Sequence, residues 1–554
     1  MLQLLFSFFA AFQQKNIYNL ALKQNNQQLL QERLIDISNP FSVNYGKYWD
    51  KDIINMLVEP EGKEELLNQL HNFSITIEKD YGDGLLISST VNNMEDVFNV
   101  NYHFIDNNEV EIIYKIPEEL NLIQFIEGFP AYNNKINKYK ESVKKNNIDN
   151  GYISSEVFKW LYNISYDSIC SCQNSSIASI EYGDNNGFNQ NDLVNNQLLN
   201  NISINRVEYS VNNGVNSDVE SQLDIQMMGL VGDNNTEIWY WNEDNWLYSL
   251  AVNIMNNNTV PDILSMSYGW AEDQQCQITT CGNITSEDYV NRVNMEYVKL
   301  GLRGITIVVA SGDAGSPGRT SEQCDPNRPI NAVFPGSSPW VVSVGATYIL
   351  NNTNTSNITA PRWNSTICNE YGCPDYKEQN IITFDKVGWT SGGGISKLSK
   401  RQSMFDNANN GYINSRVSMP WNYPKDGRMY PDVSLVGHYC PVINDNSLIA
   451  VDGTSCSTPF FATILALLNR YQLIHGKPKL GWVNPILYLM AENDSNVFTD
   501  LEDGYTWCTE QTCCPLNERN GSDFGFKATK GYDPVYGLGL PNVGRMKEWL
   551  SRWT

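Results

Sequence analysis

The stretch Gly453-Thr454-Ser455-Cys456-Ser457-Thr458-Pro459 decides the fold of this 554-residue chain. Gly453 allows a sharp backbone turn, and the apolar run at residues 460–468 predicts that a buried helix follows. Ser455 therefore stands where a turn enters a helix, and its hydroxyl can face a cleft. A serine hydroxyl is a poor nucleophile until a neighbouring base removes its proton.

Histidine, the usual base, is scarce in this chain, which contains only His71, His103, His438 and His475. Glu220 and Asp224 offer an alternative because residues four apart stand on one face of a helix. Two close carboxylates repel each other and can share a proton, which raises one pKa. Such a pair can act as a base in acid, where an ordinary histidine is protonated. The spacing alone fits two solvated carboxylates equally well.

Asp313 follows a short apolar run at residues 305–310, so it lies at the carboxyl end of a predicted strand. Ligands bind at this edge of a parallel sheet. A protonated aspartate there can donate a hydrogen bond to an oxyanion, although a turn aspartate is the simpler interpretation.

Two segments are predicted to face a substrate. Ser267, Tyr268 and Gly269 end another apolar run, and their backbone can pair with an extended peptide. Ser391, Gly392 and Gly393 form a loop whose small residues allow close backbone approach.

Asp500 and Asp533 lie in glycine-containing turns near the end of the chain. Carboxylate and backbone carbonyl oxygens suit Ca²⁺, but two turn aspartates are the alternative interpretation.

The chain is predicted to contain four parts: a signal peptide (1–13), a mixed α+β unit (14–132), a Lys/Asn-rich linker open to cleavage (133–151) and a large α/β domain (152–554). In the α+β unit we expect helices at 20–34 and 63–73, and strands at 75–77, 85–87 and 110–114. In the large domain, short apolar runs at 263–267, 305–310 and 340–344 alternate with helical stretches such as 287–300. This alternation predicts a parallel sheet covered on both faces.

Composition limits the partners and the compartment. The formal net charge of −24 offers no basic face to nucleic acid, and no later segment is apolar enough for a membrane helix. Twelve cysteines and thirteen Asn-x-Ser/Thr sequons fit a disulfide-bonded glycoprotein of the secretory pathway, either secreted or lysosomal.

Together these motifs resemble the sedolisin family of serine-carboxyl peptidases, most closely its tripeptidyl-peptidase branch. The Ile37–Tyr48 segment resembles the family's pro-region, and Phe334–Trp340 and Leu465–Tyr488 resemble its catalytic domain. The resemblance implies a subtilisin-like α/β domain preceded by an inhibitory α+β (ferredoxin-like) propeptide. It also implies an acid peptidase, made as a zymogen, that removes tripeptides from the free N-termini of peptide or protein substrates.

The resemblance also implies roles for individual residues. Ser455 would be the nucleophile, Glu220 the general base, Asp224 its orienting partner and Asp313 the oxyanion donor. One Ca²⁺ would bind the side chains of Asp500 and Asp533 and the backbone carbonyls of Leu501, Thr529 and Gly531.

Some positions depart from the family pattern. Asp452 replaces the usual serine before Gly453, and Cys456 replaces a small residue such as alanine after the nucleophile. Cys456 could be a free thiol or a disulfide partner. Thr529 and Lys530 replace a Gly-Pro pair in the predicted calcium loop.

Three alternatives stay open on the sequence alone. An endopeptidase would share the same catalytic residues. A conventional Ser-His-Asp peptidase would need His438 or His475 as its base. A catalytically silent glycoprotein could use the same cleft to bind peptides.

Overall fold

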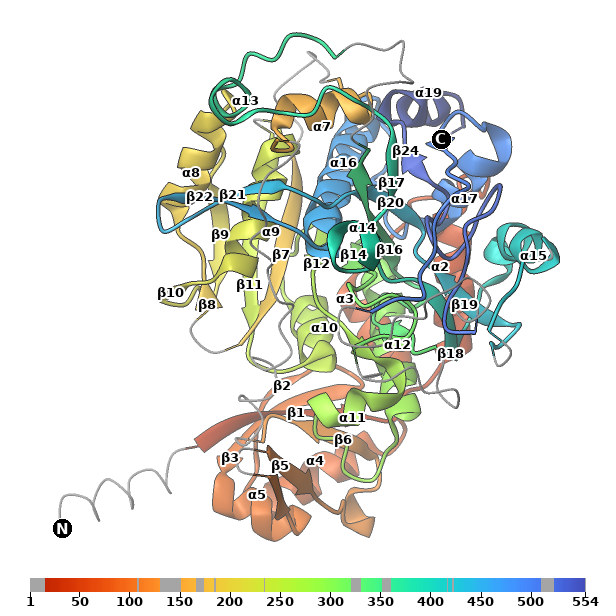
Figure 1. Ribbon diagram of the computed structural model, residues 1–554. Coiled ribbons are helices and arrows are strands. Elements are labelled where there is room, and N and C mark those ends of the chain that lie inside the picture. The colour runs from red at the N-terminus through yellow and green to blue at the C-terminus, as the bar shows by residue number, and fades with distance from the viewer. Residues whose placement is uncertain are drawn as a thin grey trace.

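The computed structural model describes residues 15–106, 109–129, 151–165, 174–183, 186–233, 235–319, 330–350, 360–415, 417–420, 423–509 and 523–553. A smaller N-terminal unit lies below a larger α/β unit (Figure 1). The predicted signal peptide and nearly all of the predicted linker lie outside the described residues, so both stay predictions.

The N-terminal unit is built on a four-stranded antiparallel sheet in the order β2-β3-β1-β6. Its strands are β1 (Lys15–Leu22), β2 (Thr76–Asp80), β3 (Gly84–Thr90) and β6 (Ile123–Glu127). Helices α4 (Lys63–Asn72) and α5 (Val91–Phe98) share a buried core with this sheet. The strand order is that of a ferredoxin-like fold, which confirms the expected α+β class of this unit.

The predicted helix at residues 20–34 is wrong in its first half. Residues up to Leu22 form β1, and the helix α2 (Gln27–Ser38) begins only after Asn26, whose φ of 55° breaks the chain direction. β1 is the central strand between β3 and β6, so pairing on both sides overrides the local helical pattern. In α2, Leu30, Leu34 and Ile37 are buried at helical spacing.

The larger unit contains an eight-stranded sheet in the order β17-β16-β14-β12-β7-β11-β9, with β20 beside β16. Every pairing is parallel except that of β16 with β17. Its strands are β7 (Ser175–Tyr182), β9 (Val207–Val211), β11 (Thr236–Glu243), β12 (Ile263–Met266), β14 (Thr306–Ala310), β16 (Val342–Ile349), β17 (Gln379–Ile381) and β20 (Val433–Val436). The three predicted runs form β12, β14 and β16, which confirms the predicted parallel sheet.

Helices cover both faces of this sheet. Because strand side chains alternate, Ile177 of β7 packs in one core with α9 (Val219–Val231) and α16 (Thr454–Ile474). Ala178 and Ile180 pack in the other core, with α10 (Leu247–Asn256) and α12 (Ser286–Leu302). Helices α10 and α12 lie between the large sheet and the N-terminal unit (Figure 1).

The N-terminal sheet docks on α10 and α12 through buried polar contacts. The Glu127 carboxylate accepts hydrogen bonds from Ser249 N, Thr279 Oγ1 and Tyr289 Oη at 2.8–3.0 Å. Asp83, in the β2–β3 turn, binds Lys299 of α12 at 2.8 Å, and both side chains are fully buried. The N-terminal unit is therefore packed directly against the larger unit through buried hydrogen bonds and an ion pair.

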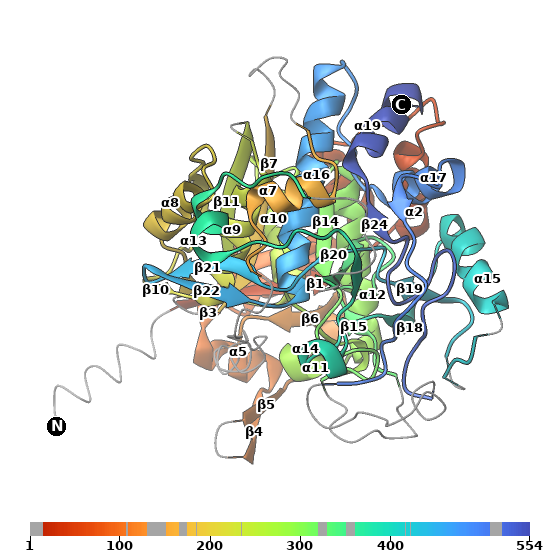
Figure 2. The same ribbon diagram turned by 45° about the horizontal axis from the view of Figure 1, so that its top comes forward.

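The hairpin β21 (Cys440–Asn444) and β22 (Ser447–Val451) leads directly into α16 and lies beside α9 (Figure 2). Other elements complete the two units: α3 (Lys51–Val58), β4 (Asn101–Asp106), β5 (Glu109–Ile113), η1 (Glu118–Leu120), α7 (Ser155–Leu161), β8 (Asn186–Gly187), α8 (Gln190–Leu199), β10 (Asn216–Ser217), β13 (Trp270–Ala271), η4 (Glu272–Gln274), α11 (Gln275–Ile278), β15 (Val333–Phe334), α13 (Thr366–Tyr371), α14 (Phe384–Val387), β18 (Gly394–Lys400), η5 (Ser403–Phe405), α15 (Asp406–Asn414), β19 (Gly427–Tyr430), α17 (Asn484–Asn493), β23 (Phe498–Thr499), β24 (Leu540–Pro541) and α19 (Val543–Trp553). Among the described helices, none has the length and apolarity needed to cross a bilayer.

Candidate active site

Ser455 lies in the first turn of α16 and is 2% exposed. Gly453 makes a close approach there, since an added Cβ would lie 3.2 Å from Asp313 Oδ2 and 3.6 Å from the Ser455 Cβ. The predicted turn into a buried helix is therefore present, and the φ of 158° and the tight space at Gly453 favour glycine there.

Glu220 and Asp224 project from one face of α9 toward this turn. Glu220 hydrogen-bonds Ser455, and Asp224 accepts hydrogen bonds from the Ser267 hydroxyl at 2.9 and 3.0 Å. Asp224 is fully buried and Glu220 is 6% exposed. The structure thus brings the predicted serine and both predicted carboxylates together, and the solvated interpretation of the pair is wrong.

Burial raises the pKa of both carboxylates. The pKa of Glu220 rises above its usual range, chiefly by desolvation and further by the charges of Glu181, Asp218 and Asp313, while its hydrogen bond with Ser455 partly opposes the rise. Burial, with the charges of Glu181 and Glu220, also raises the pKa of Asp224 well above its usual range. The cluster therefore retains protons, and its members share the charge that remains.

Glu181 is a third buried carboxylate that the sequence interpretation missed. It lies near the carboxyl end of β7 and accepts hydrogen bonds of 2.8 Å from Ser179 Oγ and Tyr268 Oη. The one available signal was a lone acidic residue in an otherwise uncharged strand, Ser175–Tyr182. Its charge acts on both Glu220 and Asp224.

Asp313 lies beside the nucleophile turn at the carboxyl end of β14. Its Oδ1 accepts hydrogen bonds from the backbone N–H and the hydroxyl of Thr454, at 2.8 and 2.7 Å, while Oδ2 faces Gly453. A cavity of about 20 Å³, lined in part by Gly269, Gly312 and Asp313, adjoins this carboxylate. The predicted oxyanion donor therefore lies next to Ser455.

The residues predicted to face a substrate lie around the same centre but make internal contacts. The hydroxyls of Ser267 and Tyr268 bind the carboxylates of Asp224 and Glu181. An added Cβ at Gly269 would lie 2.6 Å from a methyl group of Val333. Substrate contact by these residues stays a prediction.

The Ser391–Gly393 loop packs against the Asp313 loop. Gly392 N donates to Gly312 O at 2.6 Å, and Ser391 Oγ accepts from Ala346 N. An added Cβ would lie 2.2 Å from Ser311 O at Gly392 and 2.0 Å from Pro534 O at Gly393. Both glycines are therefore required for close packing, and their substrate role also stays a prediction.

Neither candidate histidine occupies the place of the base. His475 follows the last residue of α16, a 21-residue helix that begins at Thr454, so roughly 30 Å separates His475 from Ser455. His438 binds the Asp452 carboxylate through Nδ1 at 2.7 Å. Ser455 hydrogen-bonds a glutamate instead.

The predicted calcium ligands also lie together. Asp533 is fully buried and accepts hydrogen bonds from Thr529 N, Val535 N and Tyr536 N, while Asp500 accepts from Gly531 N at 2.6 Å. Burial raises the pKa of Asp533 to about 8, and the charge of Asp500 adds to this. Two mutually repelling carboxylates among backbone peptides fit a hard cation such as Ca²⁺. No cluster of three or more His, Cys, Asp or Glu side chains suited to a metal occurs within the described residues.

A parallel sheet with a buried serine at a helix start and carboxylates beside it defines a serine peptidase of the subtilase type. The chain matches the family model for the pro-kumamolisin activation domain over residues 10–131 and that for the subtilase family over residues 201–482.

Comparison with individual proteins narrows this class. Physarolisin from Physarum polycephalum is 35% identical over 551 residues, covering 96% of this chain and 93% of that protein. Human tripeptidyl-peptidase 1 is 30% identical over 345 residues, which cover 60% of this chain and 52% of that protein. Pseudomonas sedolisin, a serine-carboxyl proteinase, superposes with a TM-score of 0.51 at 17% identity, covering 73% of this chain and 99% of that structure. The chain belongs to the sedolisin family and is a serine peptidase zymogen that carries its own activation domain.

Proposed function

We propose that this enzyme is an acid peptidase in which Ser455 is the nucleophile, Glu220 the general base and Asp224 the residue that orients Glu220. The observation that carries the proposal is the hydrogen bond between Ser455 and Glu220 inside a buried carboxylate cluster. Glu220 can take the hydroxyl proton when the negative charge that the buried carboxylates share lies on its side chain.

In the proposed reaction, the Ser455 hydroxyl oxygen attacks the scissile carbonyl carbon while Glu220 takes the hydroxyl proton. The oxyanion that forms is stabilised by protonated Asp313 and by a backbone N–H near Ser455. Glu220 then protonates the leaving amine, which departs and leaves an acyl-enzyme. A water molecule, deprotonated by Glu220, hydrolyses the acyl-enzyme and restores Ser455.

We further propose that the enzyme releases tripeptides from free N-termini. The similarity to tripeptidyl-peptidase 1 supports this mode, and an endopeptidase with the same catalytic residues is the competing possibility. The N-terminal unit would act as the intramolecular inhibitor until acid removes it. Disulfides at Cys276–Cys281, Cys368–Cys373 and Cys440–Cys456 support an oxidising compartment, hence secretion or the lysosome.

The test compares two substrates on acid-activated enzyme from about pH 3 to 8: a tripeptide amide with a free N-terminus and an N-blocked longer peptide. Ser455→Ala and Glu220→Gln should each lower kcat by at least about 10³-fold. Cleavage of the tripeptide amide alone supports the exopeptidase mode, and cleavage of the blocked peptide supports the endopeptidase. Activity that peaks near neutral pH and survives Glu220→Gln would reject the carboxylate mechanism.

We also propose one structural Ca²⁺ held by the side chains of Asp500 and Asp533 and by the carbonyls of Leu501, Thr529 and Gly531. The ion would neutralise the buried Asp533. Metal analysis of the purified protein should find one calcium per chain, and Asp533→Asn should remove it. A chelator should lower the melting temperature of the wild type and leave that of the variant unchanged.

A further inference from the structure

The segment Gly437–Cys440 runs beside the turn that carries Ser455. Gly453 N donates to Gly437 O at 3.0 Å, and the Asp452 carboxylate binds two successive residues of the segment. Its Oδ2 lies 2.7 Å from His438 Nδ1, and its Oδ1 accepts from Tyr439 N at 2.9 Å. Asp452 and Gly453, which precede the nucleophile turn, are thus both hydrogen-bonded to the segment Gly437–Cys440.

The same segment also holds the residue that follows the nucleophile. Cys440 forms a disulfide with Cys456, and both are fully buried. Ser455 is therefore held between an attachment three residues before it and a covalent attachment one residue after it. Asp452 and Cys456 are the two departures from the family pattern around the nucleophile, and both find their partner in this one segment.

The His438 imidazole is enclosed. Its ring stacks on Tyr439 at 3.7 Å and meets the edge of Tyr348 at 6.4 Å, and the residue is 9% exposed. The Asp452 carboxylate faces the ring through Nδ1, and the two tyrosines contribute phenol rings. The contact of the His438 ring with Asp452 is therefore enclosed by aromatic side chains, which limits the movement of the segment beside the nucleophile turn.

We propose that His438, Asp452 and the Cys440–Cys456 disulfide form a nucleophile clasp that positions Ser455 against Glu220 and Asp313. This inference rests on the proposed role of Ser455 as nucleophile. In the clasp, histidine holds the catalytic turn instead of transferring the proton. A displacement of about 1 Å can cost about 10²-fold in rate, so attachments on both sides of Ser455 keep its hydroxyl at the distance from Glu220 that the reaction needs.

The test uses His438→Gln, Asp452→Asn, their double variant, and Cys440→Ser with Cys456→Ala. Each clasp variant should lower kcat about 10- to 100-fold and leave KM within about 2-fold, because substrate contacts are intact. The rate of Ser455 modification by a fluorophosphonate should fall in the same proportion. The double His438/Asp452 variant should be no slower than the worse single variant, since both act through one contact.

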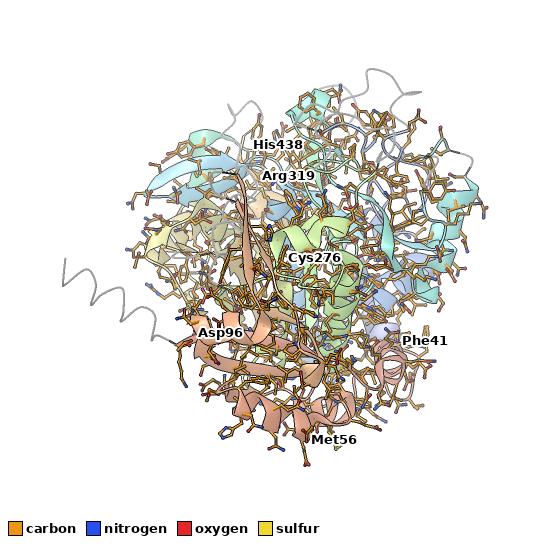
Figure 3. All side chains as sticks on the ribbon, turned by 90° about the horizontal axis from the view of Figure 1, so that it is seen from below. Phe41, Met56, Asp96, Cys276, Arg319 and His438 are labelled. Carbon is orange, nitrogen blue, oxygen red and sulfur yellow. A yellow bond between two sulfur atoms is a disulfide. The ribbon has the colours of Figure 1, made fainter. Side chains whose placement is uncertain are left out.

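The matched control is the double serine variant of Cys276 and Cys281, which removes a disulfide of α11. Figure 3 shows Cys276 well separated from His438. This control should keep the wild-type kcat. If the disulfide variant of the clasp does not fold, His438→Gln and Asp452→Asn still decide the question because both preserve side-chain size.

Two failures can be told apart. If Ser455→Ala retains activity, the proposed function is wrong whatever the clasp does. If Ser455→Ala is inactive but the clasp variants keep wild-type kcat and labelling rates while their melting temperatures fall, the clasp is structural only and the inference is overturned.

Discussion

Burial is the main cause of the raised pKa of the proposed base, and Glu181 is the neighbouring charge that adds most to it, which makes Glu181 an informative residue to change. Its negative charge raises the pKa of Glu220 and of Asp224. Glu181→Gln removes that charge, so the pKa of Glu220 should fall and Glu220 should ionise at lower pH. The acid limb of the kcat/KM profile should therefore move about one pH unit toward acid.

The control for this prediction is Glu272→Gln. Glu272 is also buried with its pKa raised to about 7, but its partners are Ser396 and Lys397, outside the catalytic cluster. The control should leave the pH profile where the wild type has it. An unshifted acid limb in Glu181→Gln would show that this carboxylate does not influence the base.

The sequence predicted those catalytic residues that lie in recognisable motifs, and it missed Glu181, which lies in none. Ser455, Glu220, Asp224 and Asp313 were found through motif order, and the structure brings all four together. Glu181 lies on strand β7, and no regular sequence spacing relates it to Glu220 and Asp224 on helix α9. Asp452 and Cys456 were noticed as departures, but their shared partner segment is visible only in the fold.

Between elements, the contact of the β2–β3 turn with α12 should control release of the N-terminal unit. Burial raises the pKa of Asp83, but Lys299 and Arg292 outweigh burial and hold that pKa below its usual range. The ionised carboxylate therefore favours docking above about pH 4, and this contribution is lost as the pH falls further. Acid thus weakens this part of the interface.

Asp83→Asn should accordingly let the zymogen convert to its shorter mature form at a less acid pH. Breaking a buried ion pair costs about 3–5 kcal/mol, enough to move the conversion by a pH unit or more. Gel analysis of zymogen held at a series of pH values measures the shift. Glu64→Gln, an exposed carboxylate on α4, is the control. Conversion of Asp83→Asn at the wild-type pH would contradict the role of this ion pair.

The sequence predicted helices and strands correctly where the hydrophobic pattern of a segment matches the faces that are buried in the fold. Continuous apolar runs gave β12, β14 and β16 because both faces of the large sheet are covered by helices. The segment at 20–34 failed because its first residues form an interior strand whose partners, β3 and β6, lie far along the chain. Pairing of that kind leaves no short-range signal.

Across the whole molecule, buried carboxylates should make the protein more stable in acid than at neutral pH. Burial raises the pKa of Glu243 and Glu272 to about 7 and that of Asp533 to about 8. A folded-state pKa above the unfolded value means that the folded form binds more protons between the two. Stability is therefore greatest below about pH 4.5 for these groups and falls as the pH rises toward 7–8.

Thermal unfolding followed by circular dichroism measures this directly, with Ser455→Ala as the background to prevent self-digestion and with a chelator present so that metal does not mask Asp533. The melting temperature should be higher at pH 5 than at pH 7.5. Glu272→Gln should narrow that difference, since each unit of pKa elevation corresponds to ~1.4 kcal/mol and the glutamine cannot ionise. Glu208 is an exposed carboxylate on β9, so Glu208→Gln should leave the difference in melting temperature between the two pH values unchanged. A melting temperature that rises with pH would mean that lowered carboxyl pKa values, such as that of Asp83, dominate the molecule instead.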